Sequence, residues 1–165
     1  MQLYLVQHGA ATNEAEDPQR RLTAEGAKTV ERMAGCLSQL NLGVDRIEHS
    51  DKERAQQTAE IMAAHLGLAQ GTRQVAGMAP NDDVAPMRER MQNESNSLML
   101  VGHLPYLSRL LSLLLGVPQD RMLVAFQMGG VVHLEREEKG EWRLRWILVP
   151  DLLSPRTTQK SAACD

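Results

Sequence analysis

The chain has 165 residues, of which 42% are hydrophobic, 3% aromatic and 24% charged, and its formal net charge is −3. This length and composition predict one globular domain with a single core. Few aromatic residues and the lack of a basic cluster argue against nucleic-acid binding. No apolar run reaches the roughly 18 residues of a membrane-spanning helix, and two cysteines cannot build a disulfide framework. We therefore expect a reduced, cytoplasmic protein without a nucleic-acid or membrane partner.

The first predicted elements are a strand, a helix and a second strand. Residues 2–6, QLYLV, form a buried strand, and residues 45–49 form a short one. Between them, Thr23 is the expected N-cap of a helix that Gly43 ends. Its apolar stripe contains Val30, Met33, Ala34, Leu37 and Leu40.

The second helix is predicted from its start signal. Ser50 followed three residues later by Glu53 has the spacing of a capping box, so the helix is expected to begin at about Asp51. Residues 71–86 should hold one short strand and a loop, and residues 84–92, VAPMRERMQ, should form a short helix.

The later elements complete an alternating pattern. Residues 97–102 read as a strong buried strand, residues 103–116 as a helix, and residues 129–149 as a closing hairpin. Alternation of strand and helix predicts a three-layer α/β/α sandwich with a mostly parallel sheet and an antiparallel edge strand. We expect one domain over residues 1–150 and a frayed tail over residues 151–165.

Polar side chains follow three of the predicted strands. His8 follows the first strand, Ser50 and Arg54 follow the second, and His103 follows the strand of residues 97–102. Ligands of open α/β sheets bind beyond the carboxyl ends of the strands. If the three strands are neighbours, two imidazoles and one guanidinium meet in one pocket, where helix N-termini add positive potential. Such a pocket suits an anion, most simply phosphate.

Several motifs around these residues resemble a known family. The segments LVQHG, HSDKERAQQTAE and VGHLP are similar to the motifs of the histidine phosphatase superfamily, which includes cofactor-dependent phosphoglycerate mutases. The segments RRLTAEG and FQMGGVVHLE, together with the compact length, resemble the SixA-type phosphohistidine phosphatases. The resemblance covers roughly residues 1–150, with the motifs in order.

This resemblance implies a role for each matching residue. His8 corresponds to the nucleophile that accepts the phosphoryl group, Arg54 to the arginine that clamps phosphate, and His103 to the second histidine on the phosphoryl oxygens. Gln7 stands where the family usually has arginine, and Asp51 where many members have proline. Neither departure affects the nucleophile.

Elementary chemistry supports the same site. A neutral imidazole is a competent nucleophile near pH 7. A guanidinium and a second, preferably protonated, histidine can stabilise a transferring phosphoryl group without a metal or cofactor. Gln7, Gly9 and Ser50 are the further phosphate-binding candidates, since glycine would let the backbone approach phosphate closely.

A general acid is the least defined part of the predicted site. Asp82 and Asp83 lie in the loop GMAPNDDVAP and are the candidates, although a polar surface loop explains them equally well. Imidazole leaves more easily than an alkoxide, so a phosphohistidine phosphatase can tolerate a poor acid.

Four functions compete at this stage. The first is dephosphorylation of phosphohistidine on a partner protein, with phosphate as product, because short gaps between the motifs leave little chain for a lid. The second is a small-molecule phosphomonoesterase or mutase. The third is a phosphate- or phosphohistidine-binding module with weak or no catalysis, which Gln7 keeps open. The fourth, a metal hydrolase using His8, His49 and His103, lacks clustered carboxylates.

Overall fold

The computed structural model describes residues 1–40 and 42–153. Six strands form one sheet: β1 (Gln2–Gln7), β2 (Arg46–His49), β3 (Thr72–Gln74), β4 (Leu98–Gly102), β5 (Val131–Arg136) and β6 (Trp142–Leu148). Four α-helices and one 3₁₀ helix accompany them: α1 (Ala24–Ser38), α2 (Glu53–Leu66), α3 (Ala85–Asn93), α4 (Tyr106–Leu114) and η1 (Pro150–Leu153).

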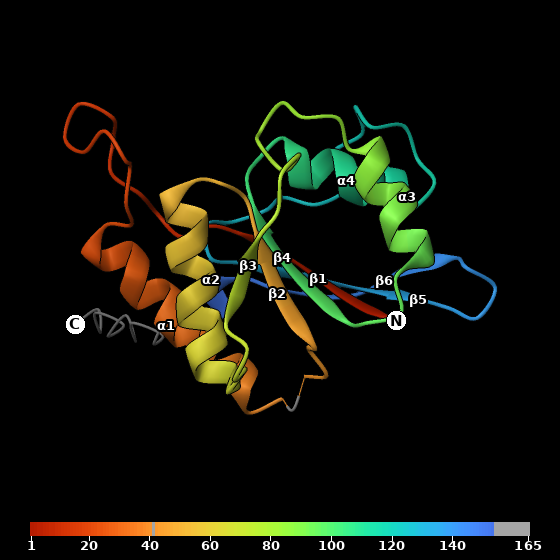
Figure 1. The fold of residues 1–165 in the computed structure, drawn as a ribbon, viewed down its shortest axis with the longest axis horizontal. Coiled ribbons are helices and arrows are strands. Elements are labelled where there is room, and N and C mark those ends of the chain that lie inside the picture. The colour runs from red at the N-terminus through yellow and green to blue at the C-terminus, as the bar shows by residue number, and fades with distance from the viewer. Residues whose placement is uncertain (41, 154–165) are drawn as a thin grey trace, which may run out of the picture.

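The strand order is β3-β2-β4-β1-β5-β6 (Figure 1). The first four strands in this order pair in parallel, whereas β5 pairs antiparallel with both β1 and β6. The predicted mostly parallel sheet with an antiparallel edge is therefore confirmed. Strand β4 lies between β1 and β2, so the carboxyl ends of these three strands are neighbours.

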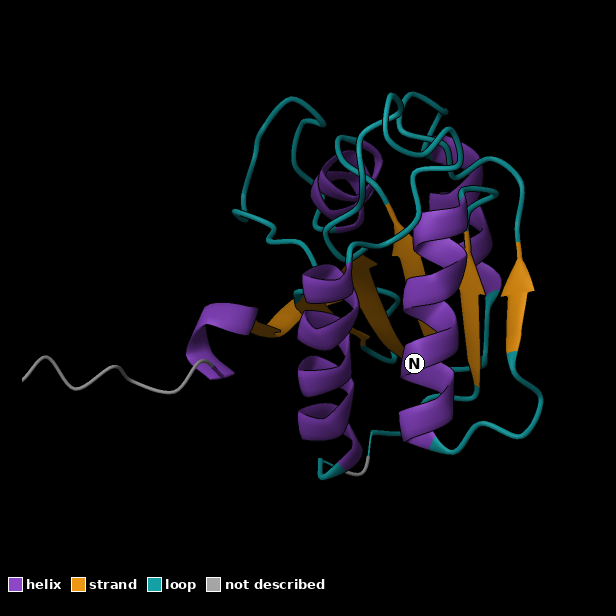
Figure 2. Cartoon of the chain, turned by 90° about the vertical axis from the view of Figure 1, so that its left-hand side faces the viewer, coloured by secondary structure: helices purple, strands orange, loops and turns teal. Residues whose placement is uncertain are grey.

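The side chains of β1 alternate between two cores. Leu3 and Leu5 pack in the core beneath α3 and α4, and Tyr4 and Val6 pack in the core beneath α1 and α2. Figure 2 shows α1 and α2 in front of the sheet. Because successive strand residues point to opposite faces, a strand that is apolar at both parities needs helices on both sides. The three-layer sandwich is confirmed.

The predicted end of α1 is wrong. Helix α1 begins after its N-cap Thr23 as expected, but it ends at Ser38 rather than at Gly43. The amide of Gln39 donates back to the carbonyls of Cys36 and Leu37, which tightens the last turn and leaves Leu40 53% exposed, outside the apolar stripe.

The start of α2 also differs from the prediction. The helix begins at Glu53 with Lys52 as its N-cap residue, and no side chain caps it. The hydroxyl of Ser50 instead lies against His103, 2.5 Å from its Nε2 atom. The capping box is therefore absent: the helix begins about two residues later than predicted, and the serine hydroxyl contacts His103, which follows β4.

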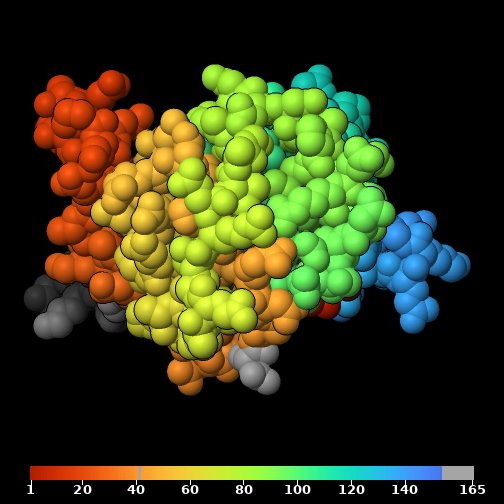
Figure 3. Space-filling view, in the orientation of Figure 1, coloured from red at the N-terminus to blue at the C-terminus, as the bar shows by residue number. Residues whose placement is uncertain are grey.

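The described chain ends in a short helix. Residues 150–153 form η1, in which Pro150 is buried; the frayed tail stays a prediction, and its residues 154–165 lie outside the described part. In Figure 3 the loop after β1 and the turn between β5 and β6 protrude from opposite sides of the molecule. Within the described ranges, no helix has the length and apolar character to cross a membrane.

Candidate active site

The sheet topology brings the three polar strand ends together. The amide of His8 donates to the carbonyl of Gly102 (3.1 Å), and the amide of Ser50 donates to the carbonyl of Val101 (3.2 Å). Residues that follow β1 and β2 are thus hydrogen-bonded to the end of β4, which His103 follows directly. The strand order thus brings the two histidines together at the carboxyl ends of β1 and β4, as predicted.

The hydrogen bonds of His8 define its tautomer. Its Nδ1 atom lies 2.7 Å from the carbonyl oxygen of Gly9, and a carbonyl can only accept, so Nδ1 carries the proton. Its Nε2 atom lies 3.2 Å from Nε of Arg54, which can only donate. The lone pair of Nε2 therefore faces Arg54, where an electrophilic phosphorus atom would have to approach.

His8 is neutral in the free site. Burial, opposed in part by the hydrogen bond to Gly9 and assisted by the charge of Arg54, lowers its pKa to about 4. The side chain is 8% exposed. A neutral imidazole with an available Nε2 lone pair is the form that attacks phosphorus.

Thr58, on α2, links the His8 loop to the helix that supplies Arg54. Its hydroxyl accepts from the amide of Gly9 (3.0 Å) and donates to the carbonyl of Arg54 (2.7 Å). Thr58 is fully buried. The sequence analysis missed this residue, since a threonine within a helix gives no signal of a bond to a strand end 49 residues away.

Gly9 contributes in a different way from the one predicted. Its amide is bonded to Thr58, and its carbonyl orients His8. A Cβ atom at Gly9 would lie 2.7 Å from a methyl group of Val30 and 3.1 Å from the carbonyl oxygen of Gly26. The glycine is therefore required for the close packing of α1 against the loop, whereas its predicted approach to phosphate stays a prediction.

His103 lies beside His8. The two ring centroids are 4.9 Å apart, with the planes inclined by 56°. The Nε2 atom of His103 is 2.5 Å from Oγ of Ser50, and its buried Nδ1 has no hydrogen-bond partner among the described residues. Burial, together with repulsion from the charge of Arg54 and from His8 when that ring is protonated, lowers the pKa of His103 to about 3. The predicted protonated histidine is thus neutral in the free site, and an incoming anion would raise its pKa.

Two charged residues near the site were not predicted as part of it. Arg20 lowers the pKa of both His8 and Arg54, so its positive charge acts on the pocket from the loop after β1. Its Nε atom donates to the carbonyl of Thr12 (3.3 Å), and its φ of 51° is the one positive value at a non-glycine residue in the described ranges. Asp51 acts in the opposite sense and raises the pKa of Arg54 and His103.

Gln7 occupies the last position of β1, opposite Gly102 in the register with β4. It is 7% exposed, and its Oε1 atom is buried without a hydrogen-bond partner in the described part of the chain. The side chain adds amide donors but no charge, so Arg54, Arg20 and Lys52 supply the positive potential.

The two candidate acids are both engaged in their own loop. Asp82 accepts from the amide of Ala79 (2.7 Å), and Asp83 accepts from the amide of Ala85 at the start of α3 (3.0 Å). These bonds are those of turn- and helix-start residues. Their role as general acids therefore stays a prediction without a supporting contact.

The alternative metal site finds no support in the geometry. His49 directs its Nδ1 atom to the carbonyl of Ser50 (2.7 Å). In residues 1–40 and 42–153, no three His, Cys, Asp or Glu side chains are grouped as metal ligands. The predicted combination of His8, His49 and His103 is not formed.

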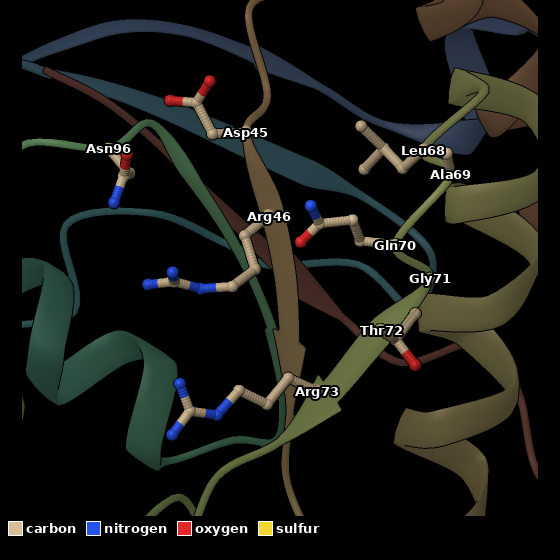
Figure 4. A pocket seen from close by; sticks show the side chains of 9 residues that line it. All are labelled: Asp45, Arg46, Leu68, Ala69, Gln70, Gly71, Thr72, Arg73 and Asn96. Carbon is tan, nitrogen blue, oxygen red and sulfur yellow. The ribbon is translucent and has the colours of Figure 1, made fainter.

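A separate hollow of about 570 Å³ lies at the other end of the sheet. It is lined by Asp45 and Arg46 at the start of β2 and by Gly71, Thr72 and Arg73 at the start of β3 (Figure 4). Arg46 is paired with Glu48 and Glu94. Since the predicted site residues lie at the opposite ends of these strands, this hollow is not part of the candidate site.

The fold and the site together define a protein suited to phosphoryl transfer through a histidine. Residues 3–75 match the family model of the histidine phosphatase superfamily (branch 1). This segment contains His8, Ser50 and Arg54. The chain belongs to the histidine phosphatase superfamily, and this membership supports a phosphatase.

Individual relatives are similar over most of the chain. The phosphohistidine phosphatase SixA of Escherichia coli (strain K12) is 26% identical over 155 residues, which are 91% of this chain and 94% of that protein. An uncharacterised protein of Picosynechococcus sp. is 37% identical over 112 residues, or 64% of this chain and 67% of that protein.

Solved structures show the same fold. The protein histidine phosphatase SixA complexed with tungstate has a TM-score of 0.83 and 26% identity, with 93% of this chain and 100% of that chain covered. The α-ribazole phosphatase of Shigella flexneri has a TM-score of 0.73 at 16% identity, with 91% and 97% covered. At that identity the likeness concerns the fold alone.

Proposed function

We propose that this chain is a phosphatase that removes the phosphoryl group from phosphohistidine on a partner protein in the cytoplasm, without a metal ion. The observation that supports it best is the hydrogen bonding of His8. Its Nδ1 donates to the carbonyl of Gly9, and its Nε2 accepts from the guanidinium of Arg54. The similarity to SixA, named as a phosphohistidine phosphatase, supports the choice of substrate.

The first step transfers the phosphoryl group to the enzyme. Nε2 of His8 attacks phosphorus and a new P–N bond forms. The P–N bond of the substrate breaks with its electron pair going to the substrate ring, which carries a proton on its other nitrogen and so departs as neutral imidazole. Arg54 exchanges its hydrogen bond to Nε2 for bonds to the phosphoryl oxygens, where a charged donor is worth about 1.5–3 kcal/mol. The carbonyl of Gly9 stabilises the cationic ring that results by accepting the Nδ1 proton's hydrogen bond.

The second step returns the enzyme to its starting state. Water attacks the phosphorus atom of phosphorylated His8, the P–Nε2 bond breaks, and phosphate is released with the proton that the water loses. His103 is neutral in the free site. The dianionic phosphoryl group raises the pKa of its imidazole when it arrives, because a nearby negative charge stabilises the protonated form. Protonated in this way, it can donate to a phosphoryl oxygen.

The choice of phosphohistidine rests on the leaving group. Asp82 and Asp83 accept backbone hydrogen bonds in their own loop, so neither has a contact that supports protonation of an alkoxide. An imidazole leaving group needs less help. The substrate that suits this site is therefore a compound with a P–N bond, such as phosphohistidine, rather than a phosphate ester.

The test compares substrates and traps the intermediate. Purified protein is incubated with a phosphohistidine protein, free phosphohistidine and a sugar phosphate, with and without a chelator. We expect the two phosphohistidine substrates to be hydrolysed faster, with no effect of the chelator, and rapid quenching to give acid-labile phosphate on His8. The variant His8→Ala should lose turnover, whereas His65→Ala, on the exposed last turn of α2, should keep it. Faster hydrolysis of the sugar phosphate, or turnover by His8→Ala, would refute the proposal.

A further inference from the structure

An apolar groove adjoins the candidate active site. Its volume is about 500 Å³, and it lies between the start of α4 and the segment that connects α4 to β5. One wall contains Leu104, Pro105 and Ser108, and the other contains Met122, Val124 and Phe126. We call this feature the apolar groove.

Both walls of the apolar groove are connected to the catalytic histidines. Leu104 directly follows His103. The other wall leads into Gly129, whose amide donates to the carbonyls of Gln7 (2.9 Å) and His8 (3.3 Å). The groove is therefore joined to the site through the backbone on both of its walls, so a protein that presents a phosphohistidine to His8 would come close to it.

The groove combines a fixed floor with an exposed apolar rim. Val124 is 8% exposed and packs in the core beneath α3 and α4, as Phe126 does in part. At the rim, Leu104 is 38% exposed and Met122 is 83% exposed. Exposed apolar side chains that gather beside a site mark an interaction surface, and methionine adapts to partners of varied shape.

The character of this rim points to the chemistry of the partner. The lining is mixed, since Gln119 and Asp120 stand beside the apolar side chains of Leu104, Met122 and Phe126. A protein surface can offer apolar side chains to these walls while its phosphohistidine protrudes toward His8, which is 8% exposed. The one charged side chain of α4 that lines the groove, Arg109, is engaged with the carbonyls of Pro80 and Asp82.

We propose that the apolar groove receives apolar side chains that flank the phosphohistidine of a protein substrate and so selects protein-bound over free phosphohistidine. This inference rests on the proposed function and adds the surface by which the partner is recognised. The contact is small, as suits an enzyme that must release its product protein after each turnover.

The experiment measures the ratio of kcat/KM for two substrates. One is a histidine-containing phosphotransfer protein phosphorylated chemically with phosphoramidate, and the other is free phosphohistidine. We expect Met122→Glu to lower the protein-to-free ratio roughly 5- to 30-fold, which corresponds to about 1–2 kcal/mol. Met122→Leu, which keeps the apolar surface, should retain the wild-type ratio, as should Leu152→Glu, which makes the same change at a 69% exposed residue of η1.

The outcomes separate the groove from the proposed function. If the wild-type protein hydrolyses both substrates and Met122→Glu leaves the ratio unchanged, the proposed role of the groove is wrong and the proposed function stands. An equal loss on both substrates also overturns the proposed role of the groove, because the groove then serves the small substrate or the fold. A wild-type protein that hydrolyses neither phosphohistidine substrate overturns the proposed function and this inference with it.

Discussion

Replacing Thr58 by valine tests the link between the nucleophile loop and α2. Valine has nearly the same shape as threonine but removes the hydroxyl that accepts from the amide of Gly9 (3.0 Å) and donates to the carbonyl of Arg54 (2.7 Å). Thr58 is fully buried, so water cannot easily replace it. The carbonyl of Arg54 keeps its bond within the helix, and the amide of Gly9 is the group that loses its partner.

The magnitude follows from that single unpaired donor. A buried donor without an acceptor costs about 1–3 kcal/mol. In a domain of this size each kcal/mol lowers Tm by about 2–4 °C, so Thr58→Val should melt roughly 2–12 °C below wild type. The same amide belongs to the residue whose carbonyl orients His8, and misplacement of a reacting group can cost up to about 100-fold in rate. We expect kcat/KM on a phosphohistidine protein to fall about 10-fold or more.

The assay combines thermal unfolding followed by circular dichroism with steady-state kinetics. Thr58→Ser keeps the hydroxyl and is the matched control, so it should retain most of the activity. If Thr58→Val melts within about 1 °C of wild type and keeps its kcat/KM, the hydroxyl does not hold the loop and this account of the site is wrong.

Four further predictions concern charge in the pocket. Arg54→Ala removes a charge-assisted donor worth about 1.5–3 kcal/mol, so kcat/KM should fall about 10- to 150-fold, and a change below about threefold would place the guanidinium outside the reaction. Gln7→Arg adds a charged fork next to the nucleophile and should raise kcat/KM on a phosphohistidine protein roughly 3- to 30-fold; a decrease would mean that the pocket is adapted to glutamine. The pKa of His8 is lowered from 6.5 to about 4 and that of His103 to about 3, so His8 should stay nucleophilic well below pH 6.5, and a kcat/KM profile with a loss centred near pH 6.5 would contradict this. Both folded-state pKa values lie below the unfolded value, so the unfolded chain binds more protons between about pH 6.5 and 4. Chemical denaturation should therefore show that the free energy of unfolding decreases as the pH is lowered across that window.

The sequence by itself determined which residues form the main strands and helices and which polar side chains follow them. Residues 3–6 are apolar at every position, which marks a buried strand, and His8, which follows that strand, must lie at its carboxyl end. Spacing of apolar residues also located the body of α1, since packing against a sheet imposes a helical period on the side chains. These are local properties, set by residues within a few positions of one another, and they sufficed for the fold class and for naming His8, Arg54 and His103.

Only the tertiary structure decided how those residues meet and in which state. The position of β4 between β1 and β2 brings His103 next to His8 and takes Ser50 away from its expected cap. Thr58 joins the site through a partner 49 residues distant, and no local pattern encodes such a pair. The neutral state of both histidines comes from burial, which depends on what covers them rather than on their neighbours in the chain. Strand order and burial are properties of the whole assembled sheet, and for that reason they could not be obtained from the motifs alone.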